Sequence, residues 1–93
     1  MSLSTFKNKT VLITGASAGV GAACARYFAH AAANLVLVAR GEPALHAIAD
    51  ELREHTQVIT ITADVSETSS CQHIVERAIE EFSAIHLLIN NAG

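Results

Sequence analysis

Apolar residues along the chain follow two alternating arrangements. Short runs of apolar and β-branched residues lie at 11–14, 35–39, 58–63 and 87–89. The run at 35–39 has no polar residue, which is typical of a parallel strand buried on both faces. Between the runs, apolar residues recur every three or four positions, as in amphipathic helices that pack on a sheet. The pattern therefore predicts four strands that alternate with three helices.

The first expected helix follows a glycine-rich turn and begins at Val20. The positions of its apolar stripe are Cys24, Tyr27, Phe28 and Ala31. We expect this stripe, including Tyr27, to pack against the sheet as part of the core. Asn34 is expected to mark the end of the helix before the second strand begins.

The second and third expected helices have stripes of the same period. Pro43 suits the first turn of the second helix, because its missing amide hydrogen would have no partner there. The stripe of this helix, which extends to 54–55, is formed by Leu45, Ile48, Ala49 and Leu52. Ser66 is expected to cap the third helix. The stripe of the third helix is formed by Cys71, Ile74, Val75, Ala78, Ile79 and Phe82.

The order of these elements predicts the fold class. Strands and helices that alternate through short connections, with right-handed crossovers, form a parallel sheet covered by helices. We expect an α/β fold of the doubly wound type, with four parallel strands and three helices. With 93 residues, the chain has room for one small domain at most.

The main candidate for chemistry is the glycine-rich turn between the first strand and the first helix, Thr14-Gly15-x-x-x-Gly19-x-Gly21. Gly15 permits a sharp exit from the strand, Gly19 lets an anion approach the backbone, and Gly21 lets the helix lie close to the sheet. The peptide groups up to Val20 and the positive end of the helix would together hold a diphosphate. No Gly-Lys-Ser/Thr follows, which excludes a Walker loop. A purely structural turn is the alternative.

The spacing of this turn resembles that of the short-chain dehydrogenase/reductase family, in its ordinary compact branch. Two further motifs match the family: Asp64-Val65 directly after the third strand, and Asn90-Asn91-Ala92-Gly93 directly after the fourth. Three motifs at three strand ends, in the family's order, are more specific than any one of them. The resemblance covers essentially the whole chain. It implies that residues 1–93 are the N-terminal portion of a single NAD(P)-binding Rossmann domain, incomplete relative to the family. The Rossmann-like, doubly wound sheet would have strand order 3-2-1-4. The first two helices would then cover one face and the third helix the other, which leaves the fourth strand as an exposed edge.

The resemblance also implies roles for the residues at these strand ends. Asp64 is expected to accept a hydrogen bond from the adenine amino group, and the Val65 amide to donate one to a ring nitrogen. Capping of the third helix by Asp64 is the alternative. Asn90 is expected to tie neighbouring strands together. The residues expected to let the backbone pass close to the adenosine ribose are Asn91, Ala92 and Gly93.

The end of the second strand indicates which cofactor is bound. Enzymes that use NAD usually place Asp or Glu there to bind the ribose 2′-hydroxyl, whereas this chain has Arg40. A guanidinium can bind a 2′-phosphate bidentately, and no carboxylate at that position would repel it. We therefore expect NADP(H), with assistance from Ser17, and NAD(H) as the second candidate. The alternative is that Arg40 is a solvated charge and Glu42 binds the ribose.

The residues that transfer protons in this family are not found in the chain. Members move hydride between nicotinamide and a carbonyl or alcohol with the help of a Ser, a Tyr, a Lys four residues after the Tyr, and an Asn. All of these follow the Asn-Asn-Ala-Gly signature. Tyr27 is the one tyrosine here, and Ala31 stands four residues after it. We expect no catalytic residue in this chain, no turnover by the 93 residues alone, and an oxidoreductase in the parent protein.

The chain departs from the family pattern at three positions. Family members usually have Gly near Ala32, and Gly and Asp at what are here Ser83 and His86. Loss of the glycines removes easy left-handed helix ends, for which Asn34 and Ser83 are expected to substitute. His86 is expected to be a surface or hydrogen-bonded structural histidine rather than a functional titrating group.

Composition and charge limit the partners of the chain. Hydrophobic residues make up 51% and charged residues 16% of the sequence, which is typical of a globular core and not of a disordered chain. Six Lys and Arg against nine Asp and Glu give a net charge of −3, so we expect no binding to nucleic acid or to an anionic membrane. The longest apolar runs are far shorter than the roughly 20 residues of a membrane span.

Cysteine and histidine spacing predicts no metal site and no disulfide framework. Cys24 and Cys71 lie far apart and have no nearby partner cysteine, as is typical of a reducing, cytoplasmic location. The remaining histidines are expected on solvated faces, without the spacing of metal ligands: His30, His46, His55 and His73.

Two other functions are compatible with the sequence. One is a non-enzymatic dinucleotide-binding or regulatory module, which senses NADP(H) or recruits a partner through the exposed sheet edge. The other is a flavodoxin-like binder, which would have a different strand order and mononucleotide chemistry. For the leading hypothesis, the parent protein is expected to be a homo-oligomer that acts on a small carbonyl or alcohol substrate, whose identity the sequence does not encode.

Overall fold

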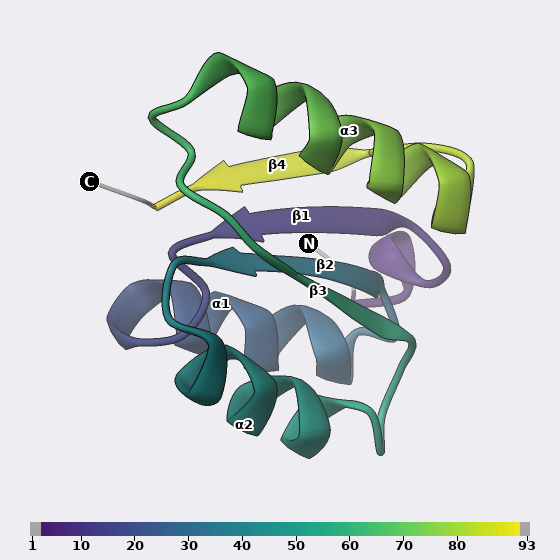
Figure 1. Cartoon of the computed structure of the whole chain (residues 1–93). Helices are drawn as coiled ribbons and strands as arrows, with labels where there is room; N and C mark the ends of the chain where they lie inside the picture. Colours follow the sequence, from purple (N-terminus) through teal and green to yellow (C-terminus); the bar gives the residue numbers. More distant parts are fainter. Residues whose placement is uncertain (1–2, 92–93) are drawn as a thin grey trace.

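The computed structural model describes residues 3–91, in which a four-stranded parallel sheet lies between two layers of helices (Figure 1). A short 3-10 helix, Leu3–Phe6, comes first. The elements that follow are β1 (Thr10–Thr14), α1 (Gly19–His30), β2 (Asn34–Ala39), α2 (Glu42–Leu52), β3 (Val58–Thr62), α3 (Thr68–Phe82) and β4 (Leu87–Asn90). The strand order β3-β2-β1-β4 confirms the predicted topology.

The register of the sheet determines which side chains share a face. Leu12 of β1 is aligned with Val36 of β2 and with Leu88 of β4. Leu12 and Val36 belong to a cluster with Ile74 and Ala78 of α3. The intervening β1 and β2 residues point the other way and pack with α1 and α2. Helices α1 and α2 therefore cover one face and α3 the other, as predicted (Figure 1).

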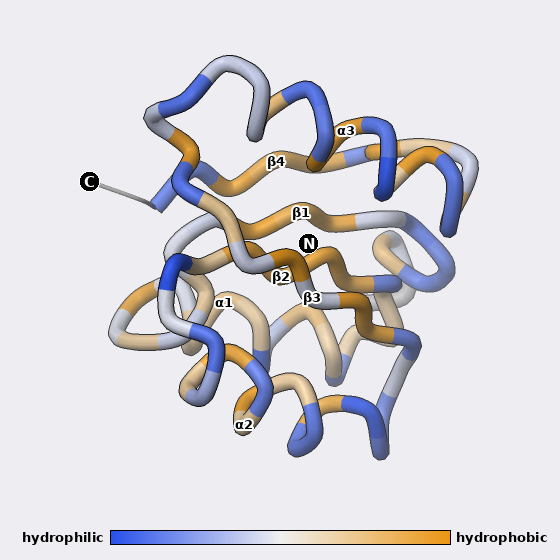
Figure 2. Tube along the Cα trace, viewed as in Figure 1, coloured by the Kyte–Doolittle hydropathy of each residue, from blue (hydrophilic) through white to orange (hydrophobic). Residues whose placement is uncertain are grey.

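Burial is greatest along the two central strands. All five residues of β1 and five of the six residues of β2 are buried. In Figure 2 the apolar colour runs along the strands, while hydrophilic residues lie on the outer turns of α2 and α3. Burial of each Val, Leu or Ile side chain contributes about 1.5–3 kcal/mol. The central strands are therefore a firm base for the loops that follow them.

Helix α1 packs on the sheet through small residues, and the predicted stripe is wrong in part. Its buried residues are Gly21, Ala22, Ala25, Phe28 and Ala29. Tyr27 was expected in the core but is 48% exposed, because small side chains bring α1 close to the sheet and leave Tyr27 on the flank. Its ring packs edge-on against Phe28, with ring centroids 5.1 Å apart.

Helix α2 confirms its predicted stripe, whereas α3 does so only in part. The four apolar residues expected to be buried in α2 are buried, and Pro43 lies in its first turn, although the helix ends at Leu52. In α3, only Ile74 and Ala78 are buried. Cys71 is exposed, and Val75 and Ile79 are 48% and 44% exposed. Within residues 3–91, α3 is the one helix on its face of the sheet, so residues on its flanks have no neighbouring helix to pack against.

Two helices end in left-handed backbone at positions where family members usually have glycine. Ala32, after α1, has φ = 61° and Ser83, after α3, has φ = 71°. Ser83 thus substitutes for glycine as expected. Asn34 does not, because it is the first residue of β2 and its amide donates a hydrogen bond to the Lys9 carbonyl. The left-handed position falls on Ala32 itself.

No helix within residues 3–91 combines the length and the apolar character needed to cross a lipid bilayer. Both thiols, Cys24 and Cys71, are free.

Candidate functional site

The carboxyl ends of the four strands meet at one edge of the sheet, where a cleft of about 710 Å³ opens. Six of the residues predicted from the sequence line it: Gly15, Ser17, Arg40, Asp64, Val65 and Asn91. Further lining residues, which were not predicted to line the site, are Ala18, Val38, Ala39, Gly41, Ala63, Ser66 and Asn90. Most of these directly neighbour a predicted residue in the chain. Their position at the end of a predicted strand was therefore the signal that could have identified them.

Three of the other predicted residues, Gly19, Val20 and Gly21, belong to the first turn of α1 and are not part of the cleft lining. Ala92 and Gly93 lie outside the described residues.

The glycine-rich turn has the backbone geometry that its sequence requires. Gly15 and Gly19 have φ of 63° and 56°, in the left-handed region. A Cβ at Gly21 would overlap the Gly15 carbonyl oxygen. The close approach that requires a glycine at 21 is therefore between α1 and the turn itself, and not only between α1 and the sheet.

The start of α1 lies beside the cleft with its amides uncapped by a side chain. The N-cap residue, Ala18, has extended backbone and no side-chain acceptor. Ala18 itself lines the cleft. The first-turn amides carry the partial positive charge of the helix end. This arrangement favours an anion at the mouth of the cleft.

A buried hydroxyl joins the ends of β1 and β4. The Thr14 hydroxyl donates to Asn90 Oδ1 (3.0 Å) and accepts from the Asn91 amide (3.0 Å). The Asn91 side chain donates in turn to the Gly15 carbonyl (3.4 Å). The strand-tying role expected for Asn90 is confirmed. This role of the Thr14 hydroxyl was not predicted from the sequence, although a polar residue at the end of a buried strand was a usable signal.

Asp64 forms a turn with the residue expected to cap α3. The Ser66 hydroxyl and amide both donate to Asp64 Oδ1, at 2.7 Å and 3.0 Å. Helix α3 begins at Thr68 with Glu67 as its N-cap, without a side-chain cap. The prediction that Ser66 caps this helix is therefore wrong, and Asp64 does not cap it either. The hydrogen bond from the Ser66 hydroxyl is the main cause that lowers the pKa of Asp64, followed by that from the Ser66 amide, and the positive charge of Arg40 contributes less.

The two candidates for the ribose at the end of β2 lie in different surroundings. Arg40 is exposed and lines the cleft. Glu42 is the first residue of α2 and is not part of the cleft lining. One carboxylate oxygen of Glu42 lies 3.9 Å from His46 Nδ1. The cleft lining at this strand end therefore includes Arg40 and not Glu42.

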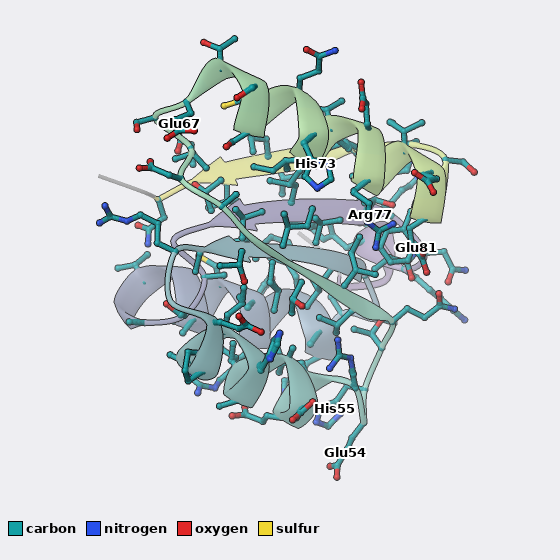
Figure 3. The ribbon with its side chains drawn as sticks, viewed as in Figure 1. Glu54, His55, Glu67, His73, Arg77 and Glu81 are labelled. Atoms are coloured by element: carbon teal, nitrogen blue, oxygen red, sulfur yellow. The ribbon has the colours of Figure 1, made fainter. Side chains whose placement is uncertain are left out.

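His86 lies at the opposite end of the sheet. Its Nδ1 accepts a hydrogen bond from the Thr10 amide (2.9 Å), and its own amide donates to the Thr10 carbonyl (2.9 Å). This confirms a hydrogen-bonded structural histidine. In Figure 3, Glu67 marks the cleft end of α3, whereas Arg77 and Glu81 lie at its far end.

The other histidines are exposed, as expected. The rings of His30 and His55 lie 4.4 Å apart between their centroids.

Comparison with known proteins gives a consistent result. A model of the short chain dehydrogenase family matches residues 9–93. The 1,6-dihydroxycyclohexa-2,4-diene-1-carboxylate dehydrogenase of Pseudomonas putida is 40% identical over 88 residues, which cover 95% of this chain and 32% of that protein.

Two solved structures have the same fold over most of the chain. A short chain dehydrogenase/reductase from Burkholderia phymatum, in complex with NAD, has a TM-score of 0.87 and 38% identity, over 89% of this chain and 30% of that one. L-sorbose reductase from Gluconobacter frateurii, complexed with NADPH and L-sorbose, has a TM-score of 0.91 and 37% identity, over 95% and 34%. The chain thus spans about a third of the length of these proteins.

Proposed function

The chain belongs to the short chain dehydrogenase family, and we propose that its cleft binds the adenosine part and the diphosphate of NADP(H), in preference to NAD(H). When bound, the nicotinamide end of such a cofactor supplies or accepts a hydride. The chain's own residues would hold and orient the other end. The strand-end cleft, the uncapped start of α1 and the left-handed glycines fit an extended anionic nucleotide.

Each part of the nucleotide has a complementary set of residues. The backbone from Gly15 to Gly21, with Ser17, would hold the diphosphate. Asp64 and Val65 would contact the adenine from the end of β3. Asn91, with Ala92 and Gly93 after it, would lie along the ribose. These are the positions predicted from the sequence, and the described ones lie in or beside one cleft.

The observation that carries the preference for NADP(H) is the position of Arg40. Arg40 lines the cleft directly after β2, where a ribose 2′-phosphate would lie, and its positive charge contributes to the lowered pKa of Asp64 in the same cleft. Glu42, the carboxylate that could take the 2′-hydroxyl instead, lies 3.9 Å from His46 and outside the cleft lining. The two solved relatives hold NAD in one case and NADPH in the other. The local charge is therefore the argument for this chain.

We further propose that the whole protein is an oxidoreductase that moves hydride between nicotinamide and a small carbonyl or alcohol. Tyr27 does not serve as its proton donor, because it lies on the flank of α1 against Phe28 and not among the cleft residues. The Ser, Tyr and Lys of the family would come from outside residues 1–93. This portion alone would then bind a cofactor without turnover. We also propose that the whole protein is a homo-oligomer in the cytoplasm and has no nucleic acid partner.

The test is a titration of the full-length protein with NADPH and with NADH, before and after Arg40→Asp. The unmodified protein should bind NADPH at least tenfold more tightly. Arg40→Asp should reduce that preference by about 10- to 100-fold, because a charge-assisted contact is replaced by a repulsive carboxylate. A tenfold or greater preference of the unmodified protein for NADH would contradict the proposal.

Lys7→Asp provides a control with the same change in net charge. Lys7 is exposed in the turn before β1, at the opposite end of the sheet from the cleft. The preference for NADPH should survive this substitution. An equal loss in both variants would mean that overall charge, and not Arg40, sets the preference.

A further inference from the structure

The Asp64 carboxylate is held by a turn that consists of residues 64–67. One of its oxygens, Oδ1, accepts from both the hydroxyl and the amide of Ser66. The Glu67 amide donates to the Asp64 carbonyl (3.2 Å). Among residues 3–91, the hydrogen-bond donors to this carboxylate all end on Oδ1. Oδ2 is thus the oxygen left to accept a hydrogen bond from a ligand.

We propose that Ser66 is a positioning residue, which fixes the Asp64 carboxylate in the cleft so that the site selects a 6-aminopurine over a 6-oxopurine. This inference rests on the proposed binding of a nicotinamide dinucleotide. It goes further in naming the residue that orients the base-reading group. Ser66 itself lines the cleft next to Asp64, but it acts through Asp64 and not on the base.

The chemistry of the carboxylate explains the selection. An ionised carboxylate only accepts hydrogen bonds, so it attracts the 6-amino group of adenine and repels the 6-oxo group of hypoxanthine. This discrimination requires that the carboxylate stays charged and keeps one orientation. The hydrogen bonds from Ser66 do both, because they lower the pKa of Asp64 and fix the position of Oδ1.

The neighbouring backbone is fixed by a different group. The Cys71 thiol donates to the Val65 carbonyl at 3.3 Å. Removal of the Ser66 hydroxyl therefore leaves this hydrogen bond to Val65 intact. It also leaves intact the hydrogen bond that the amide of residue 66 donates to Asp64. The effect of Ser66→Ala should be confined to the orientation and pKa of Asp64.

The experiment uses the full-length protein and two cofactors, NADPH and its analogue with hypoxanthine in place of adenine. Dissociation constants are measured for the unmodified protein, Ser66→Ala, Ser66→Thr and Ser69→Ala. The unmodified protein should prefer NADPH, and Ser66→Ala should reduce this preference by about three- to tenfold, the fold-change that a typical single hydrogen bond contributes. Ser66→Thr keeps the hydroxyl and should restore it.

Ser69→Ala removes a hydroxyl from the first turn of α3, outside both the Asp64 turn and the cleft lining, and should leave the preference unchanged. The ratio of the two dissociation constants is read only from folded, binding-competent protein, so partial unfolding does not change it. In a parallel NMR titration, Ser66→Ala should raise the pKa of Asp64.

The outcomes separate this inference from the proposed function. If NADPH binds and Ser66→Ala keeps the full preference over the hypoxanthine analogue, the role of Ser66 is overturned while the proposed function stands. Equal binding of NADPH and the hypoxanthine analogue by the unmodified protein would also overturn the role of Ser66. If the unmodified protein binds neither, the proposed function fails and the inference fails with it.

Discussion

Gly19 and Gly21 belong to the same turn, but a side chain would meet different surroundings at each. Gly19 has φ = 56° and open space around its Cβ position. At Gly21, a Cβ would overlap the Gly15 carbonyl oxygen and approach the Asn91 side chain. Position 19 thus requires glycine for its backbone conformation, whereas position 21 requires it because a side chain has no space there.

We expect Gly21→Ala to lower the free energy of unfolding by about 3 kcal/mol or more, because the turn must move to admit the methyl group. Gly19→Ala should cost only about 1–2 kcal/mol, the strain of a left-handed alanine. Urea denaturation of the full-length protein measures both values. Equal losses in the two variants would show that the close contact at Gly21 is not decisive.

At the scale of the element, the ends of α1 and α3 are strained. Ala32 and Ser83 adopt left-handed backbone that glycine adopts without cost. Helix α1 nevertheless ends in an ordered way, because the Ala32 amide donates to the Ala29 carbonyl and the Ala33 amide to the Phe28 carbonyl. The packing of α1 on the sheet is what holds alanine in this conformation.

Ala32→Gly should therefore stabilise the protein by about 0.5–1 kcal/mol, the relief of strain less the added freedom of the unfolded chain. Ala31→Gly is the matched control. Ala31 has φ = −83° and is buried, so glycine there should destabilise the protein by about 1 kcal/mol. Thermal and urea unfolding measure both, and a loss of stability in Ala32→Gly would refute the assignment of strain.

At the scale of the whole molecule, one side of the sheet has apolar surface without cover among the described residues. Val75, Ile79 and Leu88 are 48%, 44% and 59% exposed. Leu88 is in register with Leu12 and so points to the face on which α3 packs. β4 pairs with β1 along one edge, and within residues 3–91 no strand pairs with its other edge. Such an edge and such a surface favour association.

We therefore expect residues 1–93, expressed alone, to bind a hydrophobic dye and to unfold over a broad temperature range or to aggregate. Leu88→Gln should reduce dye binding, because it removes the most exposed of the three apolar side chains. Differential scanning calorimetry and light scattering are the measurements. A sharp, cooperative melt of a soluble monomer would contradict this expectation.

The sequence by itself determined the order of elements, and the three motifs that match the family indicated the strand order and the cleft end of the sheet. The order of elements depends on local patterns: apolar runs, helical periods, and glycines that permit particular backbone angles. The motif positions followed directly, because the carboxyl ends of parallel strands lie at one edge. The residues that line the cleft, such as Gly15, Arg40 and Asp64, could therefore be identified without coordinates.

Only the tertiary structure decided which members of a stripe are buried and which polar groups pair. Tyr27 and Val75 fit a helical period as well as their buried neighbours do, but burial depends on what stands opposite each helix. Ser66 could cap α3 or bind Asp64, and the path of the turn selects Asp64. The Thr14 hydroxyl forms hydrogen bonds with Asn90 and Asn91, which lie 76 and 77 positions away in the sequence. The physical reason is the same in each case: a local pattern encodes conformation, while burial and pairing depend on groups that only the folded chain brings together.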